Sequence, residues 1–350
     1  MSSEFWFGRR VFLTGHTGFK GGWLALWLAH MGADVFGYAL PPEHASGVYA
    51  TSDVALRLAG ETLADIRDGQ ALAMALRQAK PEIVFHLAAQ PLVRASYRDP
   101  SETMSTNVMG LVSLFEAIRA TSDVRALVNV TSDKCYQNQE WAWPYRENEA
   151  LGGHDPYSAS KACAEIITES YRNAFFADTG VAVATARAGN VIGGGDYADD
   201  RLLPDFLRAT DQGKPLVVRN PEATRPWQHV LEPLSGYMTL AQALVEKGSC
   251  FAEAWNFGPG PHDIITVRQI ADTLCDKLPK ASWTLSEDSH PKEAQSLALD
   301  STKARARLGW SPRWQIDTAL ARLLDWHVAW KAGSNMLDVT LSQVTDYEAA

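Results

Sequence analysis

Several protein classes are excluded by what this chain has little of. Its 350 residues include 4 cysteines, which are scattered and form no Cys-x-x-Cys pair, so we expect reduced thiols and no disulfide framework. Its 9 histidines stand singly, without the spacing of metal ligands, so we expect no metal site. Acidic residues (41) outnumber Lys and Arg (32), giving a net charge of -9 without any basic run, which argues against a nucleic-acid partner.

Long hydrophobic runs are also missing. The most apolar stretch, residues 21–40, is interrupted by His30 and Asp34 and divides into helix, turn and strand, so we expect no membrane span. The N-terminal residues include Glu4 and no apolar segment before a cleavage signal, so we expect no targeting peptide and a cytoplasmic protein. With 46% hydrophobic residues, no repeat and no low-complexity linker, the chain predicts a large core and two interleaved lobes.

The first chemical signal is a strand, a glycine turn and a helix in succession. Residues 10–14 form a buried-strand pattern, Gly15, Gly18 and Gly21 follow, and an apolar helix then runs to Gly32. This context is typical of dinucleotide binding, because glycines let the backbone approach a pyrophosphate at a helix N-terminus. A glycine-rich turn that binds no phosphate is the alternative.

The second predicted strand, residues 33–39, does not decide between NAD and NADP. It ends without the acidic residue that would bind the adenosine ribose of NAD, and without an arginine for a 2′-phosphate. After a short strand at residues 62–64, Asp65 and Ile66 could meet the adenine edge with a carboxylate and a main-chain N–H. A solvated loop aspartate is the alternative for Asp65.

Two further strands end in residues that suit a ligand. The strand at residues 82–87 continues into small side chains, against which a flat cofactor can lie at the carboxyl edge of a sheet. Asn107 either caps the helix that follows it or bonds a buried main chain. The strand at residues 126–130 ends in the polar segment 131–136, which packing alone does not explain, although a solvated ion pair is an alternative.

Tyr157 and Lys161 lie four residues apart on a predicted helix that begins after Asp155 with Pro156. They therefore share one helix face, where the ammonium should lower the tyrosine pKa from about 10 towards working pH. Such a hydroxyl can exchange a proton with a substrate alcohol. The same spacing also occurs by chance on solvated helix faces.

Taken in order, the glycine turn, Leu87-Ala88-Ala89, Ser132 and Tyr157-x-x-x-Lys161 resemble the extended short-chain dehydrogenase/reductase superfamily. Residues 15–21, 131–136 and 225–233 resemble the CDP-glucose 4,6-dehydratases within it, and the similarity runs from about residue 10 to 330. Relatives acting on dTDP-glucose carry Asp-Glu where this chain has Asp133-Lys134. The resemblance implies an α/β fold: a Rossmann-type doubly wound parallel sheet with a smaller, interleaved C-terminal substrate-binding lobe.

The resemblance also implies the domain limits and the site. The NAD-binding domain would comprise 1–188 and about 229–257, the nucleotide-sugar domain about 189–228 and 258–335, with a C-terminal tail at 336–350. Residues expected to bind NAD, with Tyr157 and Lys161, are Gly15, Thr17, Gly18, Phe19, Lys20, Asp65, Ile66, Leu87, Ala88, Ala89, Gln90 and Asn107. Residues expected to bind CDP-glucose are Arg94, Asn190, Arg201, Val218, Arg225, His290 and Glu293. Arginine suits a diphosphate because its planar fork donates two hydrogen bonds.

The implied reaction is loss of water from CDP-D-glucose, in deoxysugar and O-antigen biosynthesis. Tyr157 and Ser132 would serve oxidation at C4, and Asp133 would protonate the 6-hydroxyl if burial raises its pKa. Lys134 would remove the C5 proton if it is buried and neutral, or would stabilise the enolate as a cation. The helices from about Asn107 and Tyr157 would pair in a homodimer, or in a homotetramer.

Two other functions fit the same motifs. A nucleotide-sugar 4-epimerase or ketoreductase would share Ser132, Tyr157 and Lys161 but would not need Asp133 and Lys134. A catalytically silent NAD-sensing scaffold is the second alternative, although such proteins usually lose the tyrosine or the lysine, and this chain retains both.

Overall fold

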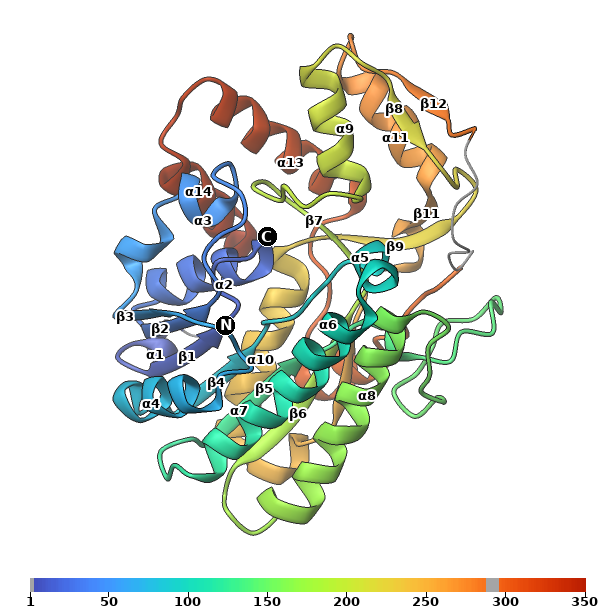
Figure 1. Ribbon diagram of the computed structural model, residues 1–350. Helices are drawn as coiled ribbons and strands as arrows, with labels where there is room; N and C mark the ends of the chain where they lie inside the picture. Colours follow the sequence, from blue (N-terminus) through green and yellow to red (C-terminus); the bar gives the residue numbers. More distant parts are fainter. Residues whose placement is uncertain (1–2, 288–295) are drawn as a thin grey trace.

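The central element is a parallel sheet (Figure 1). The computed structural model describes residues 3–287 and 296–350, so His290 and Glu293 lie outside the described residues. Within that part of the chain, seven strands form the sheet in the order β10-β6-β5-β4-β1-β2-β3. Their bounds are β1 Arg10–Thr14, β2 Asp34–Ala39, β3 Gly60–Leu63, β4 Ile83–His86, β5 Ala126–Val130, β6 Ala182–Ala188 and β10 Ala254–Phe257.

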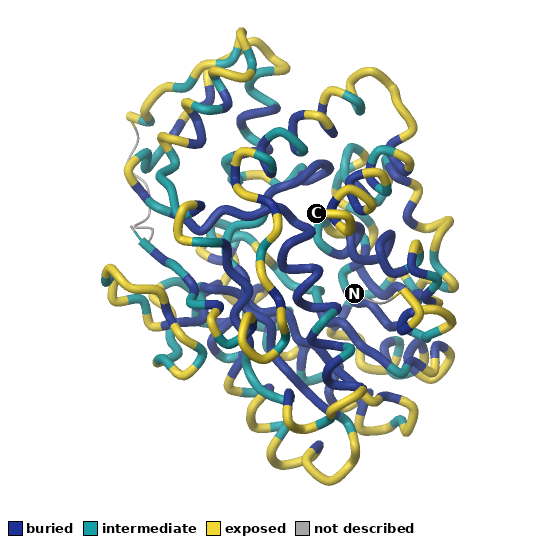
Figure 2. Tube along the Cα trace, turned by 180° about the vertical axis from the view of Figure 1, so that it is seen from behind, coloured by how far each residue is buried: buried dark blue, intermediate teal, exposed yellow. Residues whose placement is uncertain are grey.

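Helices cover both faces of this sheet, because its strands are apolar on both sides. The inner strands are buried along nearly their whole length, as the dark centre of Figure 2 shows. One face packs against α1 Ser3–Trp6, α2 Phe19–His30, α3 Val48–Thr51, α10 Leu231–Lys247, α12 Thr302–Leu308 and α14 Met336–Ala349. The other face packs against α4 Gly69–Ala79, α7 Gly110–Arg119 and α8 Pro156–Tyr171.

The strand order reverses direction beside β1, which pairs with β2 on one side and β4 on the other. In open parallel sheets, ligands bind at the carboxyl ends of the strands at such a reversal. The predicted doubly wound sheet is therefore confirmed, and the glycine turn after β1 lies at the expected position.

A smaller lobe is built from segments that leave and return to the sheet. Its strands are β7 Asn190–Ile192, β8 Leu216–Val218, β9 Thr224–His229, β11 Ile264–Thr266 and β12 Trp283–Leu285, and its helices are α9 Leu202–Asp211, α11 Val267–Lys277 and α13 Ile316–Lys331. Between β9 and β11 the chain contributes α10 and β10 to the first lobe. The lobes are thus interleaved, as predicted, and the smaller lobe has its own apolar core.

The end of the chain differs from the expected tail, because residues 336–349 form helix α14. Met336, Val344 and Tyr347 recur at helical spacing and are buried in the main core. The Tyr347 hydroxyl donates to the buried carboxylate of Glu232 at 2.7 Å, and Trp27 of α2 donates to Glu348 at 2.7 Å. Residues 336–349 are therefore part of the first lobe.

Candidate active site

The glycine turn approaches the neighbouring strand so closely that side chains are excluded. Gly15 has φ +79°, and a Cβ there would lie 2.7 Å from the backbone nitrogen of Ala88. A Cβ on Gly21 would lie 2.0 Å from the Gly15 carbonyl oxygen. Helix α2 starts after Gly18 without a side-chain cap, so its first N–H groups point into this turn. The turn has the shape and polarity that a pyrophosphate requires.

Asn107 is a buried main-chain partner, which decides between the two predicted roles. It lies in a π-helical turn, Ser105–Met109, that follows α6 Pro100–Met104. Its amide donates to the Gln90 carbonyl at 3.1 Å and accepts from the Gln90 N–H at 2.8 Å. The same amide donates to Ser160 of α8 at 2.9 Å. Asn107 thus joins the end of β4 to the helix that carries Tyr157.

The region around the predicted adenine contact contains pairs that sequence reasoning missed. The Asp65 carboxylate is held by Arg67 at 2.5 Å, and this hydrogen bond lowers the Asp65 pKa. His16 of the glycine turn is fully buried and bonds Glu61 of β3 at 2.7 Å. Gly37 makes room for this ring, since a Cβ there would lie 2.6 Å from it. The only signals in the sequence were Gly37 in the second strand and the acidic Glu61 in the third.

Ser132, Asp133 and Lys134 lie directly after β5, in and before a short 3₁₀ turn. The Ser132 hydroxyl accepts from the Lys134 N–H at 3.2 Å and donates to Asp133 Oδ1 at 3.0 Å. Asp133 is 3% exposed, and its Oδ2 is buried without a hydrogen-bond partner in the described part of the chain. Burial raises the pKa of Asp133. This increase is opposed by the positive charges of Lys134, Arg225 and Lys20 and by the hydrogen bond from Ser132. Lys134 is only half-buried, contrary to the burial expected of a neutral base.

Tyr157 and Lys161 are both buried in the first turns of α8, which Asp155 caps by accepting from the Ser158 N–H at 2.8 Å. Burial raises the pKa of Tyr157 to about 12, although a hydrogen bond with Ser132 lowers it in part. The predicted lowering by Lys161 is therefore wrong for the protein alone. Burial also lowers the pKa of Lys161 to about 8, and its ammonium donates to the Val130 carbonyl at 3.5 Å.

A buried ion pair that the sequence analysis missed lies behind these groups. Glu165, one turn beyond Lys161, accepts from Arg187 of β6 at 2.8 Å and from Thr185 at 2.7 Å. It also accepts from the Thr131 hydroxyl, which precedes Ser132. Its charge raises the pKa of Lys161 against the effect of burial. The signal available in the sequence was Glu165 four residues after Lys161, which places an acid on the same helix face as the predicted pair.

The predicted substrate residues divide into groups. Arg201 pairs with Asp196 at 2.8 Å, and Arg94 of α5 Val93–Arg98 pairs with Asp200 at 2.8 Å, so both are anchored on one loop. Arg225 is buried and acts on the Asp133 charge, and Asn190 begins β7. The Val218 side chain is instead buried in the core of the smaller lobe.

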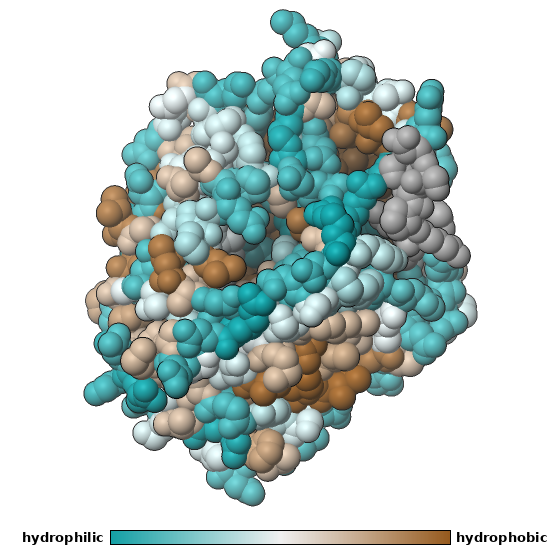
Figure 3. Space-filling view, viewed as in Figure 1, coloured by the Kyte–Doolittle hydropathy of each residue, from teal (hydrophilic) through white to brown (hydrophobic). Residues whose placement is uncertain are grey.

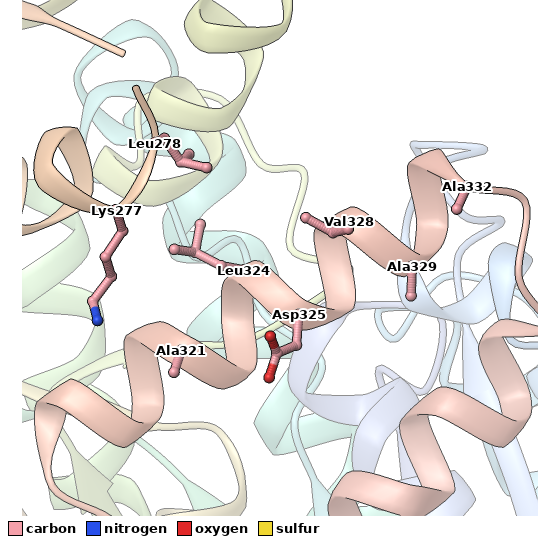
Figure 4. Close-up of a pocket in the computed structure, with 8 residues that line it drawn as sticks. All are labelled: Lys277, Leu278, Ala321, Leu324, Asp325, Val328, Ala329 and Ala332. Carbon is pink, nitrogen blue, oxygen red and sulfur yellow. The ribbon is translucent and has the colours of Figure 1, made fainter. Parts of the chain in front are cut away.

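Figure 4 shows a pocket that is separate from the candidate active site. It is a groove of about 480 Å³ between the end of α11 and α13, lined by Leu278, Leu324 and Val328 with Lys277 and Asp325 among them. It shares no residue with the polar groups above. Across residues 3–287 and 296–350, no three His, Cys, Asp or Glu side chains gather as a metal site, and no helix is long and apolar enough to cross a membrane.

Comparisons with known proteins agree with this arrangement. A family profile described as GDP-mannose 4,6 dehydratase matches residues 12–323. The CDP-glucose 4,6-dehydratase of Salmonella typhimurium (strain LT2) is 50% identical over 357 residues, covering 100% of this chain and 99% of the relative. The dTDP-glucose 4,6-dehydratase DesIV of Streptomyces venezuelae, crystallised with NAD, superimposes with a TM-score of 0.77 at 25% identity, covering 94% of this chain and 99% of that one. The epimerase Mth375 of Methanothermobacter thermautotrophicus has a TM-score of 0.80 at 23% identity, with 94% and 95% covered.

Proposed function

The chain belongs to the family described as GDP-mannose 4,6 dehydratase, and from this premise we propose that it converts CDP-D-glucose to CDP-4-dehydro-6-deoxy-D-glucose as an NAD-dependent hydro-lyase. The observation that carries the proposal is Asp133, a buried carboxyl group with a raised pKa and a free Oδ2 beside Ser132. A dehydratase needs such a proton donor next to its redox centre, whereas a 4-epimerase or ketoreductase does not.

The structure fits NAD, because Gly15 and Gly21 let the main chain turn tightly against Ala88 at the N-terminus of α2, where backbone N–H groups can meet a pyrophosphate. The main chain from Gly15 to Lys20 would hold the pyrophosphate, while Asn107 fixes the edge formed by Leu87 to Gln90. NAD held in this way would supply a hydride acceptor for C4 of the sugar and the hydride that is returned to C6. We keep Thr17 as a proposed NAD contact, and Asp65 and Ile66 as proposed contacts of the adenine edge.

In the oxidation step, Tyr157 takes the proton of the sugar 4-hydroxyl and Ser132 donates a hydrogen bond to the same oxygen. Because burial holds the Tyr157 pKa near 12, its phenolate requires added positive charge close by. Lys161 supplies part of this charge, and Glu165 keeps Lys161 protonated to a higher pH.

In the elimination step, Asp133 gives its proton to the departing 6-hydroxyl, which leaves as water. As the C5–H bond breaks, the Lys134 amine takes the proton and a C5–C6 double bond forms next to the new 4-ketone, and the proton goes back to C5 when hydride is returned to C6. Lys134 is half-buried rather than fully buried, and the ammonium that forms when it takes this proton stabilises the enolate at C5 and C4, the second role considered for it. Arg201, Arg225, Arg94 and Asn190 are proposed to bind the nucleotide diphosphate.

We further propose that the protein is a cytoplasmic homodimer or homotetramer. The outer faces of α7 and α8 carry an apolar patch, visible in Figure 3, and the exposed large hydrophobic residues of this region include Met109, Ile166 and Phe175. Two copies that paired these helices would bury the patch in a four-helix arrangement.

The test of the function is an incubation with CDP-, dTDP-, UDP- and GDP-glucose, followed by mass spectrometry. We expect a product lighter by one water from CDP-glucose. An epimerase would give a product of unchanged mass, and a silent scaffold would give none. A lighter product from another nucleotide sugar, and not from CDP-glucose, would overturn the assigned substrate but not the reaction.

A further inference from the structure

Lys20 belongs to the cofactor turn by sequence, but its side chain lies in the electrostatic field of the catalytic centre. It is the second residue of α2, directly behind the glycine turn. The charged groups that act on its ammonium are Arg201 and Asp196 of the smaller lobe, Lys161 of α8, and Asp133 after β5. Charged groups from both lobes thus act on the ammonium.

Packing contacts independently place the smaller-lobe loop against the start of α2. Trp23, one turn beyond Lys20, donates its indole N–H to the Gly194 carbonyl at 2.9 Å. A Cβ on Gly193 would lie 3.2 Å from the Phe19 ring. On its other side the loop packs against Trp326 of α13, where a Cβ on Gly194 would lie 2.0 Å from the ring. The loop that continues to Asp196 and Arg201 is therefore fixed beside the first turn of α2.

Positive charge exceeds negative charge at this meeting point. Asp196 is already paired with Arg201, and Asp133 has a raised pKa that favours its neutral form. No hydrogen bond or ion pair joins Lys20 to any other residue described by the structure. A half-buried lysine next to Arg201 and Lys161, without an acid of its own, is arranged for an anion that the protein does not supply.

We infer that Lys20 is a counter-cation shared by two diphosphates, that of NAD in the glycine turn and that of the nucleotide sugar beside Arg201. The inference rests on the proposed function, which brings two diphosphate ligands to one cleft. Each ligand alone would be attracted by the ammonium, and together they would otherwise repel each other. Lys20 therefore couples the binding of the cofactor to that of the substrate.

The protonation of Lys20 supplies a second signature. Burial, Arg201 and Lys161 lower its pKa to about 7, while Asp133 and Asp196 oppose the shift. Near pH 8 the amine is then largely neutral in the protein alone. A diphosphate placed beside it stabilises the ammonium, so ligand binding should take up part of one proton.

The test is calorimetric titration of the full-length, NAD-saturated protein with CDP and, separately, with cytidine, which lacks the diphosphate. We expect Lys20→Met to weaken CDP binding roughly 10- to 100-fold, the usual effect of one charge-assisted hydrogen bond, and to leave cytidine binding unchanged. The affinity of stripped Lys20→Met protein for NAD should fall to a similar degree. Lys277→Met, at the exposed end of α11, is the matched control and should bind both ligands as the wild type does.

Lys20→Arg keeps the charge but cannot become neutral, so it should bind CDP nearly as the wild type does, without proton uptake. Proton uptake is measured at pH 8 in two buffers of different ionisation enthalpy, first with NAD titrated into stripped protein and then with CDP titrated into NAD-bound protein, and the two uptakes together should amount to part of one proton. The shared role would be overturned if the wild type and Lys20→Met bound CDP with equal affinity. It would also be overturned if the substitution weakened the binding of NAD alone. If the wild type bound another nucleoside diphosphate but not CDP, the proposed substrate would fail, and the same comparison with that diphosphate would still test Lys20.

Discussion

Replacing Asp133 by asparagine should separate oxidation from dehydration. The asparagine carbonyl can still accept from Ser132, as Asp133 Oδ1 does at 3.0 Å, so the oxidation groups keep their arrangement. The amide nitrogen takes the place of Oδ2, which has no partner among the described residues. An amide cannot deliver a proton to a leaving hydroxide, so elimination should slow by roughly 10²–10⁴-fold, the typical contribution of one positioned acid.

The assay is stopped-flow absorbance in the NADH band, paired with mass analysis of quenched samples. Asp133→Asn should accumulate the NADH signal together with a 4-keto sugar that retains its 6-hydroxyl. The matched control is Asp263→Asn, another buried aspartate with a raised pKa, which accepts from the Ile316 N–H in the smaller lobe. Wild-type release of dehydrated product by Asp133→Asn would refute the assignment, and the acid would then have to be another group.

Three further outcomes follow from other parts of the molecule. Tyr157→Phe should abolish oxidation at C4 while NAD still binds, and turnover within tenfold of the wild type would show that another group takes the proton. Light scattering at micromolar concentration should show a dimer or tetramer. Ile166→Glu places a charge on the apolar patch of α8 and should shift the oligomeric state towards the monomer. Burial raises the pKa of Glu232 to about 7, so its contribution to stability is full below about pH 4.5 and falls as the pH rises through 7, by about 3 kcal/mol in all. Urea unfolding at pH 5 and pH 8 should therefore differ less in Glu232→Gln than in the wild type.

The sequence predicted those features that depend on neighbouring residues. Residues 10–14, 82–87 and 126–130 are predominantly apolar, and each contains a buried parallel strand or coincides with one. The glycine turn and the Asp155-Pro156 start of α8 are likewise local signals. The end of the chain was missed because α14 has only a modest apolar face, and its place depends on Trp27 and Glu232, which are distant in sequence.

Contacts between distant residues also decided the site details that the sequence could not show. Arg67 lies only two residues from Asp65, yet the sequence does not show whether this arginine or solvent holds the carboxylate, and the pairing of Glu61 with His16 needs the register of β2 and β3. Val218 shows the converse, because a short apolar strand does not reveal which of its residues faces a core and which a ligand.

The sign of the Tyr157 pKa shift shows why spacing alone was insufficient. The Tyr-x-x-x-Lys spacing gives the direction of one interaction, the attraction between phenolate and ammonium. Burial acts on both groups and favours the neutral form of each, and in this protein it is the larger effect. Tyr157 and Lys161 alone therefore do not produce a phenolate near neutral pH. Under the proposed function, Tyr157 would therefore need further positive charge nearby, such as that of the oxidised cofactor, before it could take a proton from the sugar.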